Sequence, residues 1–117
     1  MVVKLNLIVL QSEDIFALMS FYLALGLEFV AEQHDSGPNH YSCNIQGVVF
    51  ELYPSQLSNS NLRLGFEVPS LDDRFLALLK RSGGETVKPP AETPEGRKAV
   101  VKDPDGRKIE LTEAVNG

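Results

Sequence analysis

Hydrophobic positions along the chain follow strand spacing and helix spacing in turn. Residues 3–10 are mostly apolar, with β-branched side chains and leucines, which predicts a first strand. A helix is expected next, with Ser12 as its N-cap and Gly26 at its end, because these apolar residues recur every three or four positions: Ile15, Leu18, Met19 and Tyr22. Three further strands are predicted at residues 27–33, 41–45 and 48–53.

The same order of patterns then begins again. Residues 62–68 predict a strand, and a helix capped by Ser70 is expected to end at Gly83-Gly84. Its apolar stripe consists of Leu71, Phe75, Leu78 and Leu79. Residues 89–96, with their prolines, are expected to form a loop, and the remaining strands are predicted at 85–88, 97–102 and 107–112.

Both halves end in the same motif. Residues 47–52 and 106–111 each read Gly-x-x-apolar-Glu-Leu, a glycine turn that leads into a strand with one carboxylate. We infer an internal duplication, with one βαβββ repeat over about residues 1–57 and a second over 58–117. The predicted fold class is α+β, one domain in which the repeats form a curved mixed or antiparallel sheet around a cleft, with the helices on the convex face.

Composition restricts the class of protein. With 117 residues, 43% of them hydrophobic, the chain is long enough for one domain with a core. No apolar run is long enough for a membrane span, and no signal peptide precedes the first strand, so we expect a cytoplasmic protein. A net charge of -5 without a Lys/Arg cluster disfavours nucleic acid and mildly favours a cationic small molecule.

The two motif glutamates, Glu51 and Glu110, are the main candidate site residues. Strands disfavour glutamate, and its symmetric placement favours a functional site over a structural ion pair or a solvated surface. Strand alternation places Tyr53 on the same face as Glu51, so it is expected to bind ligand as part of the cleft lining, with a core or dimer contact as the alternative. Asn6 and Arg63 are expected on the free face of the sheet as ligand-binding residues, with exposed strand positions as the alternative.

Two histidines and one cysteine are weaker candidates. His34 and His40 flank a turn at residues 35–39 and could bind a metal together, but surface or dimer-contact histidines are the favoured interpretation. The single Cys43 cannot form an internal disulfide, and no nearby histidine supports its being a nucleophile.

The duplicated pattern resembles the glyoxalase/bleomycin-resistance/dioxygenase superfamily, also called the vicinal oxygen chelate fold. The resemblance covers essentially the whole chain, and its strongest part is Asp-Pro-Asp-Gly-x-x-Ile-Glu-Leu at residues 103–111. Further matching pieces are Ser-Phe-Tyr at 20–22, Leu-Gly-Leu at 25–27 and Phe-Glu-Leu at 50–52. The superfamily includes isomerases, epimerases, dioxygenases, thiol transferases and metal-free antibiotic-binding proteins, and its members are commonly dimers.

In metal-dependent members of this superfamily, four strands supply His, Glu, His and Glu to one divalent ion. The resemblance puts Glu51 and Glu110 at the glutamate positions and Arg63 at the second histidine position. The first histidine position falls at Asn6, with a one-residue ambiguity to either side. Both histidines are therefore missing, so we expect no tightly bound metal, and any metal that binds would use the two glutamates.

Three interpretations stay open from the sequence. The leading one is a homodimeric binder of a small organic molecule in the cleft, of the sequestration or resistance type, or a degenerate enzyme. The alternative is a metal-dependent glyoxalase-like lyase or isomerase, with Glu51 or Glu110 as a catalytic base that takes a proton from carbon beside a carbonyl. The third is an interaction protein whose cleft is filled by its own side chains.

Overall fold

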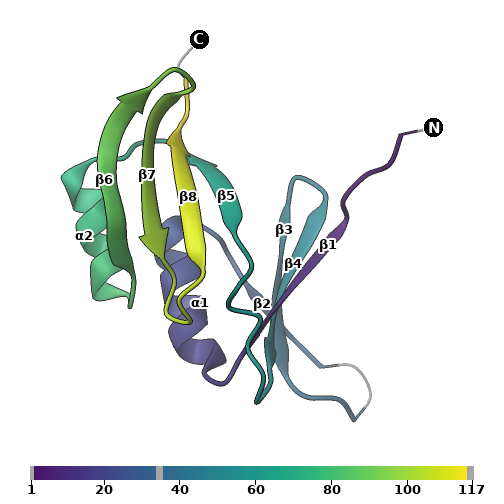
Figure 1. The fold of residues 1–117 in the computed structure, drawn as a ribbon. Coiled ribbons are helices and arrows are strands. Elements are labelled where there is room, and N and C mark those ends of the chain that lie inside the picture. The colour runs from purple at the N-terminus through teal and green to yellow at the C-terminus, as the bar shows by residue number, and fades with distance from the viewer. Residues whose placement is uncertain (1, 34–35, 116–117) are drawn as a thin grey trace. The chain divides into compact units, whose positions relative to one another are not determined.

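The computed structural model describes residues 2–33 and 36–115, which form two compact units (Figure 1). The N-terminal unit, residues 1–59, and the C-terminal unit, residues 60–117, each contain one helix and one four-stranded sheet. The predicted α+β fold class with two βαβββ repeats is confirmed. That the repeats together form one domain stays a prediction.

The N-terminal sheet has the strand order β1-β4-β3-β2. Its elements are β1 (Leu7–Ser12), α1 (Ile15–Leu25), β2 (Val30–Glu32), β3 (His40–Ile45) and β4 (Val48–Pro54). Strands β1 and β4 run parallel, whereas β4, β3 and β2 are antiparallel neighbours. Helix α1 lies against β1 and β4 and covers one face of this sheet. The opposite face carries the alternate side chains of the same strands.

The C-terminal sheet repeats this arrangement in the order β5-β8-β7-β6. Its elements are β5 (Leu64–Val68), α2 (Asp73–Arg81), β6 (Glu85–Thr93), β7 (Gly96–Lys102) and β8 (Lys108–Glu113). Figure 1 shows these strands side by side, from teal β5 to green β6, with α2 beside β6. Strand β5 is parallel to β8, so the crossover through α2 matches the one through α1.

Each unit has an apolar core between its helix and one sheet face. In the N-terminal unit Phe21, Tyr22 and Phe50 are almost completely buried, and Tyr22 packs edge-on against Phe50 with ring centroids 5.2 Å apart. Ile109 and Leu111 are fully buried in β8, while Glu110 between them is on the opposite face. Strand alternation thus separates an apolar face from a face that carries the motif glutamates.

The Asp-Pro-Asp-Gly turn is built around a buried arginine. Nη1 of Arg107 lies 3.0 Å from Oδ2 of Asp103 and 3.1 Å from Oδ2 of Asp105, and the Arg107 side chain is fully buried. Asp103 Oδ1 also accepts the backbone N–H groups of Asp105 and Arg107. Gly106 has φ of 90°, a left-handed conformation that favours glycine. The motif therefore has a structural role, which is to position the start of β8.

Several predicted boundaries are wrong. The helices are capped by Asp14 and Asp72 instead of Ser12 and Ser70, since these carboxylates accept the N–H of the residue three positions on. The predicted loop at 89–96 is mostly strand, because β6 continues to Thr93 with register shifts. Strand β6 is at the sheet edge, and Pro89 and Pro90 lie in the register shift between Lys88 and Ala91, where the regular pairing with β7 is interrupted.

The first strand also begins later than the pattern predicts, at Leu7 instead of residue 3. The apolar side chains of Val3 and Leu5 precede it and are exposed. Among the residues that the structure describes, no helix is long and apolar enough to cross a membrane.

Candidate functional site

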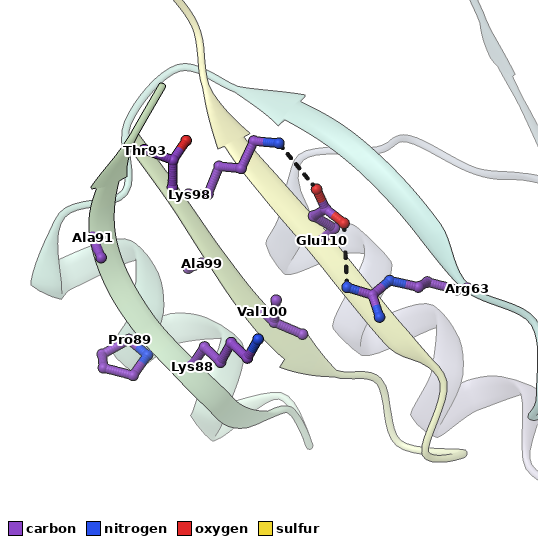
Figure 2. A pocket seen from close by; sticks show the side chains of 9 residues that line it. All are labelled: Arg63, Lys88, Pro89, Ala91, Thr93, Lys98, Ala99, Val100 and Glu110. Atoms are coloured by element: carbon purple, nitrogen blue, oxygen red, sulfur yellow. Dashed lines mark hydrogen bonds and ion pairs between the residues drawn. The ribbon is translucent and has the colours of Figure 1, made fainter. Parts of the chain in front are cut away.

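Glu110 in the C-terminal unit forms two ion pairs with neighbouring strand residues. Its Oε1 atom lies 3.2 Å from Nζ of Lys98, and its Oε2 atom lies 3.3 Å from a guanidinium nitrogen of Arg63 (Figure 2). One oxygen faces each cation, so the carboxylate is held between Lys98 on β7 and Arg63, the residue immediately before β5. Arg63, a ligand-binding candidate from the sequence, thus lies beside the motif glutamate of its own unit.

A glycine lies beside this ion pair. Gly65 is the β5 residue paired with Glu110, and Arg63 lies two residues earlier, on the same side of the strand by alternation. No side chain at Gly65 separates the guanidinium from the carboxylate. Its backbone needs no left-handed conformation, so the glycine is not required by strand geometry.

The two cations keep Glu110 ionised. They hold the pKa of the Glu110 carboxyl below its ordinary value of 4.5, with the Lys98 hydrogen bond as the largest cause and the Arg63 hydrogen bond next. A carboxylate with a lowered pKa is a weak base near neutral pH. This environment favours an electrostatic role for Glu110 over proton abstraction.

A small cavity adjoins this ion-pair group. It has a volume of about 230 Å³ and is lined by Arg63, Lys88, Pro89, Ala91, Thr93, Lys98, Ala99, Val100 and Glu110. Strands β6 and β7 supply most of the lining, and Figure 2 shows Lys88 and Lys98 near opposite ends of it. Three cationic side chains oppose one carboxylate, so the cavity favours anions. A larger hollow of about 550 Å³ beside Glu13 and residues 54–56 is shallow and brings together no group of charges.

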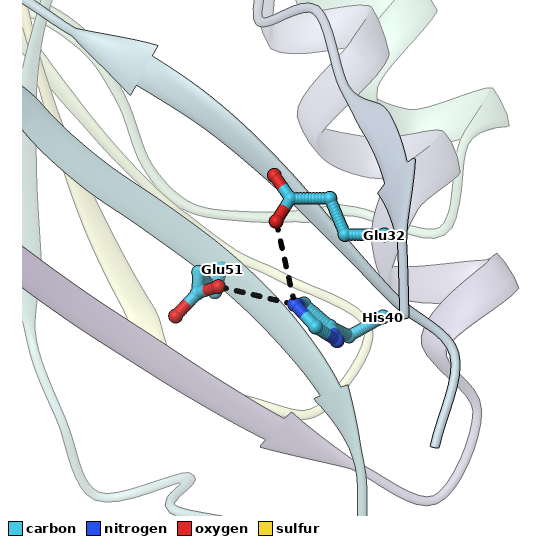
Figure 3. A group of neighbouring side chains, drawn as sticks. All are labelled: Glu32, His40 and Glu51. Carbon is cyan, nitrogen blue, oxygen red and sulfur yellow. Dashed lines mark ion pairs between the residues drawn. The ribbon is translucent and has the colours of Figure 1, made fainter. Parts of the chain in front are cut away.

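In the N-terminal unit Glu51 belongs to a separate group of side chains. Its Oε2 atom lies 3.3 Å from Nε2 of His40 on β3, and Glu32 Oε2 on β2 lies 3.8 Å from the same nitrogen (Figure 3). His40 is 1% exposed, whereas the side chains of Glu51 and Glu32 are 15% and 35% exposed. The imidazole therefore lies beneath two partly accessible carboxylates.

The ring of His40 is held in one orientation. Its Nδ1 atom is 3.3 Å from the carbonyl oxygen of Pro38, which can only accept a hydrogen bond, so Nδ1 carries a proton. Tyr53 stacks on the ring, with centroids 4.1 Å apart and planes 15° from parallel. Ser42 donates its hydroxyl hydrogen to Glu32 Oε1. These contacts direct Nε2 toward both glutamates.

The structure also locates the weaker candidates. Asn6 is exposed just before β1, and its carbonyl accepts the N–H of Val49 at 2.9 Å. Cys43 is partly buried, and burial raises the pKa of its thiol, which makes the reactive thiolate scarcer. His34 lies outside the described residues, so neither its surface placement nor a metal site shared with His40 is tested. A surface placement is wrong for His40, which is 1% exposed beneath the side chains of its own unit.

The strand registers resolve the ambiguity in the first histidine position. Val9 pairs with Glu51 as Gly65 pairs with Glu110, and two residues before these come Leu7 and Arg63. Leu7 therefore corresponds to Arg63, and a leucine supplies no metal ligand. In the other unit the Arg63 and Lys98 cations already face both oxygens of Glu110. These positions do not fit the metal that the superfamily resemblance implies.

Sequence reasoning did not find Lys98, Lys88 or Glu32, and it gave His40 little weight. Lys98 could have been found from alternation along β7, which places it on the side of the sheet that faces Glu110. Glu32 and His40 are adjacent only through the β2–β3 register, where they form the last antiparallel pair. No spacing within the sequence shows that contact.

Comparison with known proteins agrees with this fold. A model of the Glyoxalase/Bleomycin resistance protein/Dioxygenase superfamily matches residues 4–111, so the chain belongs to that superfamily. Comparison with curated proteins gave no match.

Solved structures of similar fold share little sequence with this chain. A glyoxalase-related enzyme from Fulvimarina pelagi is 21% identical, with a TM-score of 0.75 over 95% of this chain and 88% of that one. The fosfomycin resistance protein FosX from Mesorhizobium loti is 17% identical, with a TM-score of 0.72 over 99% and 95% of the two chains. TioX from Micromonospora sp. ML1 is 17% identical, with a TM-score of 0.70 over 96% and 99%.

Proposed function

We propose that this protein binds a small organic molecule with an anionic group in the cavity beside Glu110, without a metal held by that glutamate. The observation that carries the proposal is the pair of cations on the Glu110 carboxylate. They occupy the oxygens that a metal would need. With Lys88 they also leave an excess of positive charge in the cavity.

The size and lining of the cavity limit the ligand further. A volume of 230 Å³ lies below the range of about 300–1,000 Å³ that is typical of drug-sized ligands, so a small molecule or one part of a larger ligand fits. Pro89, Ala91 and Val100 offer apolar contacts near the charged groups. A short organic acid with a compact apolar body suits both features. The net charge of the chain favoured a cationic ligand. We propose an anionic ligand instead, because the cavity has an excess of positive charge although the whole chain is negative.

A thermal-shift comparison of matched probes tests this proposal. Benzoate and benzylamine have the same ring and opposite charge, and the phosphonate fosfomycin extends the test to a second kind of anion. We expect the anions to raise the unfolding temperature, because a ligand that binds only the native state stabilises it, by about 2.7 kcal/mol at a hundred times its dissociation constant. Stabilisation by benzylamine and by neither anion would contradict the proposal.

A second candidate is the sequestration of an antibiotic or similar compound, for which binding alone suffices. The matching superfamily includes bleomycin resistance proteins by name, and the fosfomycin resistance protein has the same fold. A binder leaves its ligand chemically unchanged, so mass spectrometry of a recovered ligand separates sequestration from turnover. The interaction-protein interpretation is favoured instead if no small molecule stabilises the native state.

The enzyme alternative is a metal-dependent lyase or isomerase in which Glu51 or Glu110 is the base. Glu51 suits this role better, because it is mostly buried and, among the residues that the structure describes, pairs with His40 and with no lysine or arginine. A glyoxal–thiol adduct serves as the test substrate for this alternative. NMR measures how fast deuterium from the solvent replaces the hydrogen on its carbon beside the carbonyl. Exchange that is lost in Glu51→Gln and retained in Glu110→Gln would favour it over the binder.

We also propose that the protein is a homodimer in the cytoplasm and has no nucleic-acid partner. Val3 and Leu5, which are 92% and 66% exposed, provide apolar surface that a second copy could cover. Light scattering at several concentrations measures the oligomeric state. A monomer at all of them would exclude the dimer.

A further inference from the structure

We propose that Glu32, His40 and Glu51 form a binding site for a first-row divalent cation on the N-terminal sheet. The site differs from the superfamily metal position, because two of its three residues, Glu32 and His40, come from β2 and β3. It is independent of the cavity beside Glu110, and either proposal can fail without the other.

The separation of the donor atoms suits a metal ion. One ligand atom from each residue lies within 4.8 Å of the other two, and the distances from Nε2 to the glutamate oxygens are 3.3 and 3.8 Å. Ligands on a tetrahedral ion, each about 2.1 Å from it, lie roughly 3.4 Å from one another. The donors are therefore close to their bound separation, and modest rotation of the half-exposed Glu32 brings its oxygen nearer.

The protonation of His40 favours a cation at this point. Because Nδ1 donates to Pro38, a neutral imidazole directs the lone pair of Nε2 toward two carboxylate oxygens. The three donor atoms converge on one point, and the two carboxylates together match the charge of a divalent ion.

Neighbouring groups orient the donors as outer-shell residues do in metalloproteins. The Pro38 carbonyl fixes the tautomer of His40, and Ser42 holds the second oxygen of Glu32. Tyr53 keeps the imidazole plane in place by stacking. A donor set of one imidazole and two carboxylates suits zinc, manganese, cobalt, nickel or iron, and three protein ligands leave a coordination position open.

Zinc binding to the full-length protein tests the site. The protein is stripped with chelator, and zinc is titrated calorimetrically into wild type and the variants Glu32→Gln, Glu51→Gln and Glu110→Gln. We expect one zinc per chain and a loss of affinity in Glu32→Gln and Glu51→Gln of more than the roughly 10- to 100-fold that outer-shell changes give. Glu110→Gln and the exposed strand control Glu67→Gln should bind as wild type does.

Glu32→Gln is the decisive variant because Glu32 has no counterpart in the superfamily metal set. Circular dichroism in the presence of chelator shows whether each variant is folded. If Glu32→Gln does not fold, Ser42→Ala is used instead, because it removes only the hydroxyl that holds Glu32. Cobalt substitution adds a spectrum that reports directly on the donor atoms. No stoichiometric zinc binding, or binding unchanged in Glu32→Gln and lost in Glu110→Gln, would overturn the proposal.

Discussion

Nζ of Lys98 lies 3.2 Å from Oε1 of Glu110, across the antiparallel pair of β7 and β8. Arg63, immediately before β5, contacts the other oxygen of the same carboxylate. A glutamate that the superfamily resemblance assigns to a metal is therefore neutralised by side chains of its own unit. This relationship changes the expected ligand of the C-terminal unit from a cation to an anion.

The first prediction concerns the pKa of Glu110. Replacing Lys98 by Met should raise this pKa more than replacing Arg63 by Met, because Lys98 is the largest cause of the lowering. NMR titration of the Glu110 side chain measures both variants against the exposed helix control Lys80→Met. Equal pKa values of Glu110 in all three variants would mean that the ion pairs are too solvated to shift this pKa.

A related pH dependence of stability follows from the sign of the shift. Since the folded-state pKa lies below the ordinary value of 4.5, the stabilising contribution of Glu110 is present above that pH and is lost as pH falls through the folded value. In urea unfolding below pH 4.5, wild type should lose more stability than Glu110→Gln does. Parallel losses in the two proteins would contradict the assignment.

The second prediction compares two glycines in the C-terminal unit. Gly65→Ala should stabilise the protein by roughly 0.5–1 kcal/mol, because the strand backbone is ordinary and the new Cβ meets only the Glu110 carbonyl oxygen at 3.8 Å. Gly83→Ala should destabilise it, since Gly83 has φ of +94° and its Cβ would approach Pro104 Cγ to 3.0 Å. Denaturant unfolding measures both, and effects of the same sign would contradict this account.

The third prediction concerns the buried arginine in the Asp-Pro-Asp-Gly turn. Asp103→Ala removes the carboxylate that pairs with fully buried Arg107 and accepts two backbone N–H groups. Breaking such a pair costs about 3–5 kcal/mol, so the variant should be severely destabilised. Asp105→Ala should be milder, because the Asp105 side chain is 19% exposed and water can replace part of the contact. Chemical denaturation ranks the two, and the reverse order would refute the structural role.

The sequence predicted the fold class and the duplication because both depend on local patterns that occur twice. Apolar periodicity and the two Gly-x-x-apolar-Glu-Leu motifs located Glu51 and Glu110 on strand faces opposite the core. Helix caps were misplaced by two residues because serine and aspartate are both favoured at the N-cap, and the sequence pattern does not choose between them.

The immediate surroundings of the glutamates could not be predicted in the same way. The contacts of Glu110 with Lys98 and of Glu51 with His40 connect residues on neighbouring strands, and they depend on hairpin register. Prolines at 89 and 90 suggested a loop where β6 continues, which concealed the strand that lines the cavity. Charge in the cavity likewise differs in sign from the net charge of the chain.

Titration of the isotope-labelled protein with benzoate, followed by amide chemical shifts, tests the central proposal most directly. We predict that the shifted amides cluster on β6 and β7 around Lys88, Lys98 and Val100. Lys88→Met should weaken binding by about tenfold, or 1.4 kcal/mol, while Lys80→Met leaves it unchanged. Shifts confined to other surfaces, or binding of benzylamine at the same cavity with equal or greater affinity, would contradict an anion-binding site beside Glu110.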